Sequence, residues 1–235
     1  MNTKPWFVFG AVWWFCLTTV PLGAQVTTIK IAESSDEPQA IVLSVLGPCN
    51  YSEDGKAFSG LKVGQVVEQG AVIRTGVEAR TDLFFRRIGT TVRFQPGTEV
   101  KLEKMARHMK DGAPVMETLL DLRTGRIFTV VRSLVSGSTL EIRNAAGRSV
   151  VEGGGGKGRY IITADGTQVA DKDSVVPLKV FGETGITVIT PGQKFSAKEG
   201  KALPLSAPDA VELLIDWDEL ESLVEKQAPP AKSAK

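Results

Sequence analysis

Histidine is nearly missing from this chain of 235 residues, which contains only His108. Hydrolases of the triad type need a histidine as general base, and histidine-based metal centres need several such ligands. No serine of the chain lies within a Gly-x-Ser-x-Gly motif, which marks the nucleophile of many hydrolases. The sequence therefore argues against a catalytic triad, and it indicates neither a resident metal nor any other cofactor.

Cysteine is scarce as well, because the chain has only Cys16 and Cys49. Cys16 lies in an apolar run near the N-terminus, so a chain that loses this run keeps one cysteine and cannot form an internal disulfide. Residues 47–51 (GPCNY) carry no positive charge that would activate the remaining thiol. We expect Cys49 to be buried and inert, and the fold to rest on the burial of apolar side chains.

An excess of basic residues is also lacking. The whole chain has a formal net charge of +1, and Lys4 is its only charged residue before Gln25, so residues 25–235 are formally neutral. Proteins that bind a phosphate backbone carry a clear basic excess. We therefore expect no nucleic-acid partner.

A long apolar run lies near the N-terminus, at residues 6–20. Lys4 precedes it and the small residues Gly23 and Ala24 follow it, which is typical of a secretory signal peptide. We predict a signal peptide over residues 1–24, cleavage after Ala24, and a periplasmic or secreted protein. The alternative is an uncleaved membrane anchor, since residues 5–24 approach the roughly 20 residues that span a bilayer. Only in that case do we expect contact with a membrane.

Apolar residues recur at a spacing of two in three runs, at Leu83 and Phe85, Val92 and Phe94, and Val100 and Leu102. A period of two places one set of side chains on one face of a β-sheet. Residues 86–89 (RRIG) predict the first turn between these runs. Pro96-Gly97 predicts a second turn of type II, because proline presets the first central φ and glycine permits a positive second one. The pattern predicts a three-stranded antiparallel meander with one buried face.

Short apolar runs separated by glycine and proline extend this pattern over residues 41–200. We predict an all-β domain there, mainly antiparallel, as a sandwich or barrel-like core of short strands. The close spacing of glycines over residues 60–100 leaves a β-solenoid as the alternative. Within the domain we expect a charged linker at residues 106–113 and two strands around a turn at Gly125. The glycine-rich residues 153–158 are expected to form a loop.

The segments on either side of this domain have other patterns. Residues 25–40 are polar and predict a mobile leader. Residues 207–226 carry apolar side chains at three- and four-residue spacing, which predicts one C-terminal amphipathic helix. Residues 227–235 lack apolar side chains and are expected to be disordered.

The β region resembles the FecR-type periplasmic domain over roughly residues 41–200. The residues that carry this resemblance are Leu61, Val63 and Gly64, then Gly70, Ile73, Thr75 and Gly76, then Leu83 and Phe85, the segment 89–98, Gly125-Arg126-Ile127, residues 139–143, and Gly192-Gln193. The resemblance implies an exported sensing or binding module of the bacterial cell envelope. The chain departs from the family at residues 151–156, where a short Arg-Gly-Thr element is common. Only five residues precede the apolar run at residues 6–20, so we expect no cytoplasmic anti-sigma segment.

The candidate binding residues are basic or aromatic: Arg86, Arg87, Arg93, Lys157, Arg159 and Trp217. Arg86 and Arg87 occupy a predicted hairpin turn. Arg93 is expected on the outward face of the next strand, close to Lys101, in a basic cluster suited to carboxylates or sugars. Lys157 and Arg159 adjoin a glycine run that lacks the hydroxyl residue of a P-loop but offers backbone amides to an anionic group. Trp217 lies on the apolar stripe of the predicted helix, where it forms a partner hot spot or covers strands of its own domain.

The leading hypothesis is an exported, non-enzymatic binding or sensing module of the bacterial cell envelope that interacts with a protein partner or an envelope glycan. One alternative is an envelope-polymer hydrolase that uses two carboxylates, for which Glu103, Glu117 and Glu141 are candidates. The other is a structural adaptor tethered to the membrane by an uncleaved N-terminus. The sequence does not indicate the oligomeric state.

Overall fold

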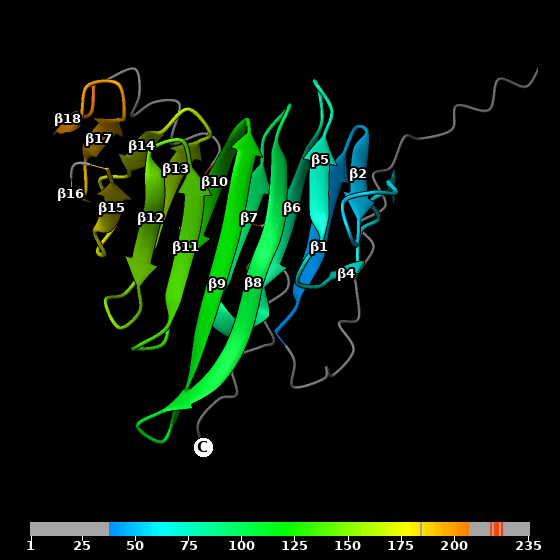
Figure 1. Cartoon of the computed structure of the whole chain (residues 1–235), viewed down its shortest axis with the longest axis horizontal. Helices are drawn as coiled ribbons and strands as arrows, with labels where there is room; N and C mark the ends of the chain where they lie inside the picture. Colours follow the sequence, from blue (N-terminus) through cyan, green and yellow to red (C-terminus); the bar gives the residue numbers. More distant parts are fainter. Residues whose placement is uncertain (1–37, 184, 207–216, 218, 221, 223–235) are drawn as a thin grey trace, which may run out of the picture. The chain divides into compact units, whose positions relative to one another are not determined.

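The computed structural model describes residues 38–183, 185–206, 217, 219, 220 and 222. Its strands form two sheets of nine strands each (Figure 1). Sheet A runs in spatial order through β18 (Lys201–Pro204), β17 (Gln193–Ser196), β14 (Thr167–Ala170), β13 (Gly158–Thr163), β10 (Arg126–Val131), β7 (Thr90–Phe94), β6 (Arg80–Phe85), β1 (Ala40–Leu46) and β4 (Val66–Val67). Sheet B runs through β16 (Gly185–Ile189), β15 (Leu178–Gly182), β12 (Gly147–Glu152), β11 (Thr139–Asn144), β9 (Ala113–Thr124), β8 (Glu99–Lys110), β5 (Val72–Thr75), β2 (Cys49–Ser52) and β3 (Ser59–Gly60).

The two sheets bury one common apolar core between them. Leu83 and Val92 of sheet A belong to the same buried cluster as Leu102, Leu120 and Leu140 of sheet B. Neighbouring strands pair antiparallel, apart from the parallel pair β9 and β11. The predicted all-β sandwich is therefore confirmed. Neither sheet of the described residues closes into a barrel.

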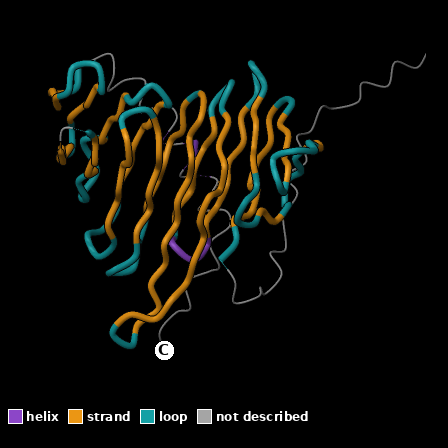
Figure 2. Tube along the Cα trace, viewed as in Figure 1, coloured by secondary structure: helices purple, strands orange, loops and turns teal. Residues whose placement is uncertain are grey.

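The chain advances along this sandwich in one direction, and successive groups of strands join sheet A and sheet B alternately. In Figure 1 the colours pass from blue at β1, through green at β8 and β9, to orange at β18. Short turns join most neighbouring strands (Figure 2). The order of strands in each sheet therefore follows their order along the chain closely.

The predicted three-stranded meander is wrong in its third strand. β6 and β7 pair in sheet A, with the 3-10 helix η1 (Arg86–Ile88) in the predicted turn between them. β8 instead crosses to sheet B, where it pairs with β5 and β9. The crossing follows the turn at Pro96-Gly97, where Gly97 has the predicted positive φ of 69°. The Thr75 hydroxyl donates to the Gln95 carbonyl at 2.6 Å and ties this crossing to β5.

The predicted linker at residues 106–113 is also wrong, because these residues form the far end of the β8–β9 hairpin. Lys110 pairs with Ala113 across a turn in which Asp111 and Gly112 both have positive φ, the geometry of a type I′ hairpin. The two strands predicted around Gly125 are confirmed as β9 and β10. They belong to opposite sheets, and Gly125 has φ 79° where the chain passes between them. A loop follows β12 at residues 153–157, as predicted.

The ends of the domain differ slightly from the predicted bounds. The first strand begins at Ala40, and the β series continues beyond residue 200 through β18. The predicted signal peptide, residues 25–37 of the leader, and the C-terminal tail lie outside the described residues. Of the predicted helix at 207–226, only Trp217, Glu219, Leu220 and Ser222 are described. No helix within the described part of the chain is long and apolar enough to span a membrane.

Candidate functional site

The outer face of sheet B carries charges that are largely matched in pairs. Glu99 accepts hydrogen bonds from Arg74 at 2.7 Å and from Arg123 at 3.0 Å. Burial raises the pKa of Glu99, but these two hydrogen bonds and the charges of the arginines more than offset burial and lower it. Further ion pairs on the same sheet join Arg143 to Glu103, Arg148 to Glu141, and Lys179 to Glu152. Such pairs are typical of a solvent-exposed surface rather than of a site that binds a charged ligand.

The three carboxylates offered as candidates for the hydrolase alternative are each paired with a basic side chain. Glu103 and Glu141 contact arginines, and Glu117 accepts a hydrogen bond from Lys104. That hydrogen bond lowers the pKa of Glu117. A glycosidase general acid needs a raised pKa, so Glu117 does not suit that role.

The outer face of sheet A is organised around a buried ion pair. The β6–β7 register places Asp82 directly opposite Arg93, and each side chain is at most 1% exposed. Arg93 donates from Nε to Asp82 Oδ1 at 2.7 Å and from Nη2 to Asp82 Oδ2 at 3.1 Å. The hydroxyl of Ser44 on β1 donates to the same carboxylate at 2.5 Å. Both charges are therefore held within a network of hydrogen bonds, as buried charges require.

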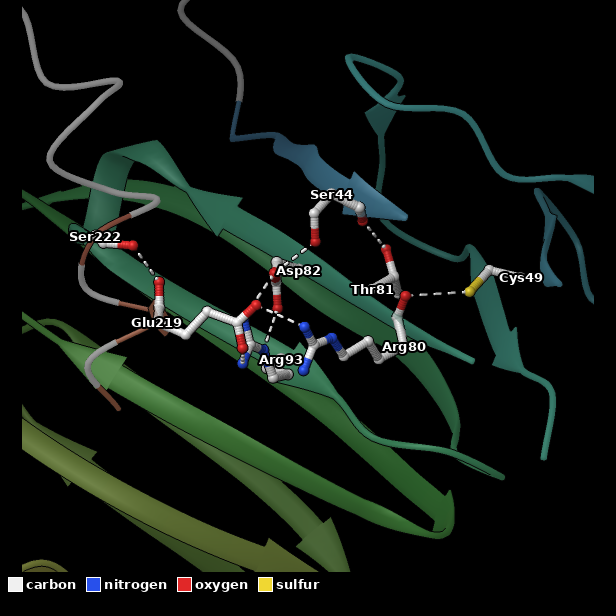
Figure 3. Close-up of polar contacts among 8 residues, drawn as sticks. All are labelled: Ser44, Cys49, Arg80, Thr81, Asp82, Arg93, Glu219 and Ser222. Atoms are coloured by element: carbon white, nitrogen blue, oxygen red, sulfur yellow. Dashed lines mark hydrogen bonds and ion pairs between the residues drawn. The ribbon is translucent and has the colours of Figure 1, made fainter. Parts of the chain in front are cut away.

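Glu219, from the C-terminal segment, completes this network (Figure 3). Its Oε1 lies 2.5 Å from Arg80 Nη2, and its Oε2 lies 3.1 Å from Arg93 Nη1. Burial lowers the pKa of Arg93, but the hydrogen bond and charge of Asp82, together with Glu219, outweigh burial and raise it. Two arginines of neighbouring strands thus form a site for one carboxylate, and the chain's own glutamate fills it.

An apolar cluster lies on the same outer face, over β10, β13 and β14. Trp217 and Leu220 are both fully buried there. Their strand partners are Phe128, Val130, Ile161 and Val169. The rings of Trp217 and Phe128 have centroids 5.6 Å apart at an interplanar angle of 45°, a tilted aromatic contact. The C-terminal segment is therefore fixed to sheet A by two kinds of contact, one apolar and one ionic.

The structure brings only part of the predicted candidate residues together. Arg93 and Trp217 both lie where the C-terminal segment packs on sheet A, Arg93 on the sheet side and Trp217 on the segment. Arg93 is on the predicted face of its strand but is buried rather than exposed, and Lys101 lies in the other sheet. Trp217 is buried on its own domain and covers a sheet face rather than strand edges.

The other four candidates lie elsewhere. Arg86 and Arg87 belong to η1, the first half-buried and the second exposed. Lys157 is exposed on the loop before β13, whereas the Arg159 side chain is 10% exposed and lies 3.7 Å from Asp173.

The sequence interpretation missed four residues of this network, namely Ser44, Arg80, Asp82 and Glu219. The hairpin register offered one signal: if Leu83 faces Val92, Asp82 must face Arg93 across the same pair of strands. Arg80 and Glu219 are 139 residues apart in the chain, and no local pattern links them.

Comparison of the chain with protein-family models, with curated proteins and with solved structures finds no match. The resemblance to the FecR-type domain therefore stays a prediction, and the function must be argued from the site itself.

Proposed function

We propose that this chain is an exported, non-enzymatic binding and sensing module of the bacterial cell envelope, and that the outer face of sheet A is its binding face. The partner is a protein that presents an acidic amphipathic segment. One observation carries this proposal: a carboxylate is held between Arg80 and Arg93 beside an apolar cluster, and the ligand in place is a segment of the chain itself.

The chemistry of the partner is inferred from this internal ligand. Trp217, Glu219 and Leu220 present an aromatic ring, a carboxylate and an aliphatic side chain within four residues. The two apolar side chains are 0% exposed, whereas the Glu219 side chain is 46% exposed. Burial of each apolar side chain stabilises docking by about 1.5–3 kcal/mol, whereas a half-exposed ion pair contributes about 1 kcal/mol or less. Apolar burial therefore supplies most of the affinity, and the arginine pair selects an acidic segment.

Sensing follows from competition for this face. A partner segment with the same chemistry can occupy sheet A only where the chain's own segment has left it. Partner binding and release of the C-terminal segment are therefore thermodynamically linked, so each favours the other. The released segment is the output of the proposed sensor.

A protein partner fits the described surface better than a glycan does. Recognition of sugars commonly relies on exposed aromatic rings, and every phenylalanine, tyrosine and tryptophan among the described residues is buried or half-buried. The carboxylate site and the apolar cluster instead match groups that a polypeptide carries.

The test uses the full chain and a labelled synthetic peptide of residues 209–226 (DAVELLIDWDELESLVEK). In the test chain, Trp217→Ala and Glu219→Gln loosen the internal segment, which frees the face for the peptide. We expect this chain to bind the peptide more tightly than the unsubstituted chain by about tenfold or more. The measurement is fluorescence anisotropy at constant pH and salt.

Two controls keep the result specific. Arg80→Glu, added to the loosened chain, replaces a side chain that is 30% exposed with one that repels the peptide's carboxylate, and it should weaken peptide binding severalfold without unfolding the sheet. A peptide that carries the same two substitutions should not bind. If the loosened chain keeps its β-sheet circular dichroism but fails to bind the peptide, or binds it equally well after Arg80→Glu, the proposed function is wrong.

A further inference from the structure

The two sheets end in four edge strands, and one of them differs from the others. β3 and β4 are only two residues long. β18 carries Lys201 and ends in Pro204, two features that hinder the pairing of an exposed edge with another strand. β16 is five residues long, and its sequence, GITVI, contains no charge and no proline. Of the described edges, only β16 is both long and without such protection.

The side chains of β16 are also unusually apolar for a surface. Ile186 is 62% exposed and Val188 is 46% exposed, whereas Ile189 is buried in the core. Ile186 pairs with Phe181 of β15, which places both side chains on the outer face of sheet B. The rest of that face carries ion pairs. The free edge of sheet B therefore ends in a small apolar patch beside the charged surface.

We propose that β16 is a self-association edge, at which two copies of this chain pair their β16 strands antiparallel and extend sheet B across a twofold axis. Among the described residues, β16 pairs only with β15. In an antiparallel ladder, alternate residues of an edge strand direct their backbone N–H and C=O groups away from the existing neighbour. These groups on β16 can accept a second strand.

A second copy is the occupant because β16 is self-complementary. A twofold axis at Thr187 sets Ile186 of one copy opposite Val188 of the other, and the reverse pair follows by symmetry. Both pairs are apolar and lie on the same outer face, so they join the two patches into one. Because the strand carries no charge, pairing brings no like charges directly opposite each other. The nearest basic side chain on β15, Lys179, is already bonded to Glu152 at 2.7 Å.

Pairing of one short strand gives a small interface, so the dimer is expected to be weak and dependent on concentration. The first experiment is sedimentation velocity on the full mature chain over a wide range of protein concentrations. We expect a reversible monomer–dimer equilibrium in the unsubstituted chain. Val188→Lys should weaken it by about tenfold or more, because it replaces an apolar contact on both sides of the axis.

The matched control is Val77→Lys, at a side chain that is 87% exposed in the turn between β5 and β6, and it should leave the equilibrium unchanged. A second measurement tests the register directly. Thr187→Cys places two thiols opposite each other across the axis and should give a disulfide-linked dimer under mild oxidation, while the native Cys49 is buried and does not compete. A chain that is monomeric at every concentration, or one that Val188→Lys does not affect, would overturn the proposal.

Discussion

The buried pair of Asp82 and Arg93 gives the most decisive test of how sheet A is held together. Asp82→Asn keeps the size and shape of the side chain but removes its charge. The amide offers one oxygen where the carboxylate accepted from Arg93 and from Ser44. Arg93 therefore stays charged and 0% exposed, and it keeps its contact with Glu219.

The expected cost follows from burial. Removing one partner of a buried ion pair typically costs about 3–5 kcal/mol. Asparagine retains an acceptor and Glu219 stays in place, so we expect the lower end, about 3 kcal/mol. For a domain of this size that is a fall in melting temperature of about 6–12 °C. Glu219→Gln changes a half-exposed pair and should cost about 1 kcal/mol or less.

The assay is urea unfolding monitored by circular dichroism, with every variant prepared and measured under the same conditions. The double substitution Asp82→Leu with Arg93→Met removes both charges together and should be less destabilising than Asp82→Asn alone, because no charge is left buried without a partner. If Asp82→Asn lies within about 0.5 kcal/mol of the unsubstituted chain, the typical range for a surface substitution, the reasoning is refuted.

Two further predictions concern ionisable groups outside this pair. Burial raises the pKa of the Cys49 thiol to about 11, so the folded protein should not react with a thiol reagent at neutral pH. After unfolding, the chain should react at one thiol if the signal peptide has been removed, and at a second, Cys16, if it is retained. The folded-state pKa of Glu99 is lowered by Arg74 and Arg123 against the opposing effect of burial, so its contribution to stability is present above the ordinary value of 4.5 and is lost as the pH falls through the folded-state pKa. Glu99→Gln should flatten the loss of stability below pH 4.5 in urea unfolding, and an unchanged pH dependence would contradict this.

Alternation of apolar and polar residues identified many of the strands but did not assign them to sheets. In a sandwich each strand buries one face, whichever layer it joins, so residues 83–85 and 100–102 show the same pattern from opposite sheets. The assignment depends on where a turn crosses the core. Pro96-Gly97 indicated a tight turn, but nothing local distinguishes a turn within a sheet from a turn between sheets.

The outer face of sheet A escaped prediction for a related reason. A period of two separates the two faces of a strand but does not say what covers the second one. The run Ile127–Phe128–Thr129–Val130–Val131 carried a signal, because apolar side chains on both faces indicate a strand buried on both sides. Its cover comes from Trp217 and Leu220, and that pairing depends on tertiary contacts that no local pattern encodes.

The docking of the C-terminal segment also determines when, during synthesis, the apolar outer face of sheet A can be covered. Because synthesis runs from the N-terminus, the sandwich can assemble strand by strand in the order in which the chain appears, each new hairpin finding its neighbours already in place. The apolar patch over β10, β13 and β14 is complete once Val169 has been made, but only Leu205 packs against it before Trp217 and Leu220 follow. While residues 170–216 are being made, the growing chain exposes most of this apolar surface. A chain that stopped before residue 217 would leave the surface exposed. Trp217 and Leu220 therefore cover a surface that a chaperone or protease would otherwise recognise as incompletely folded.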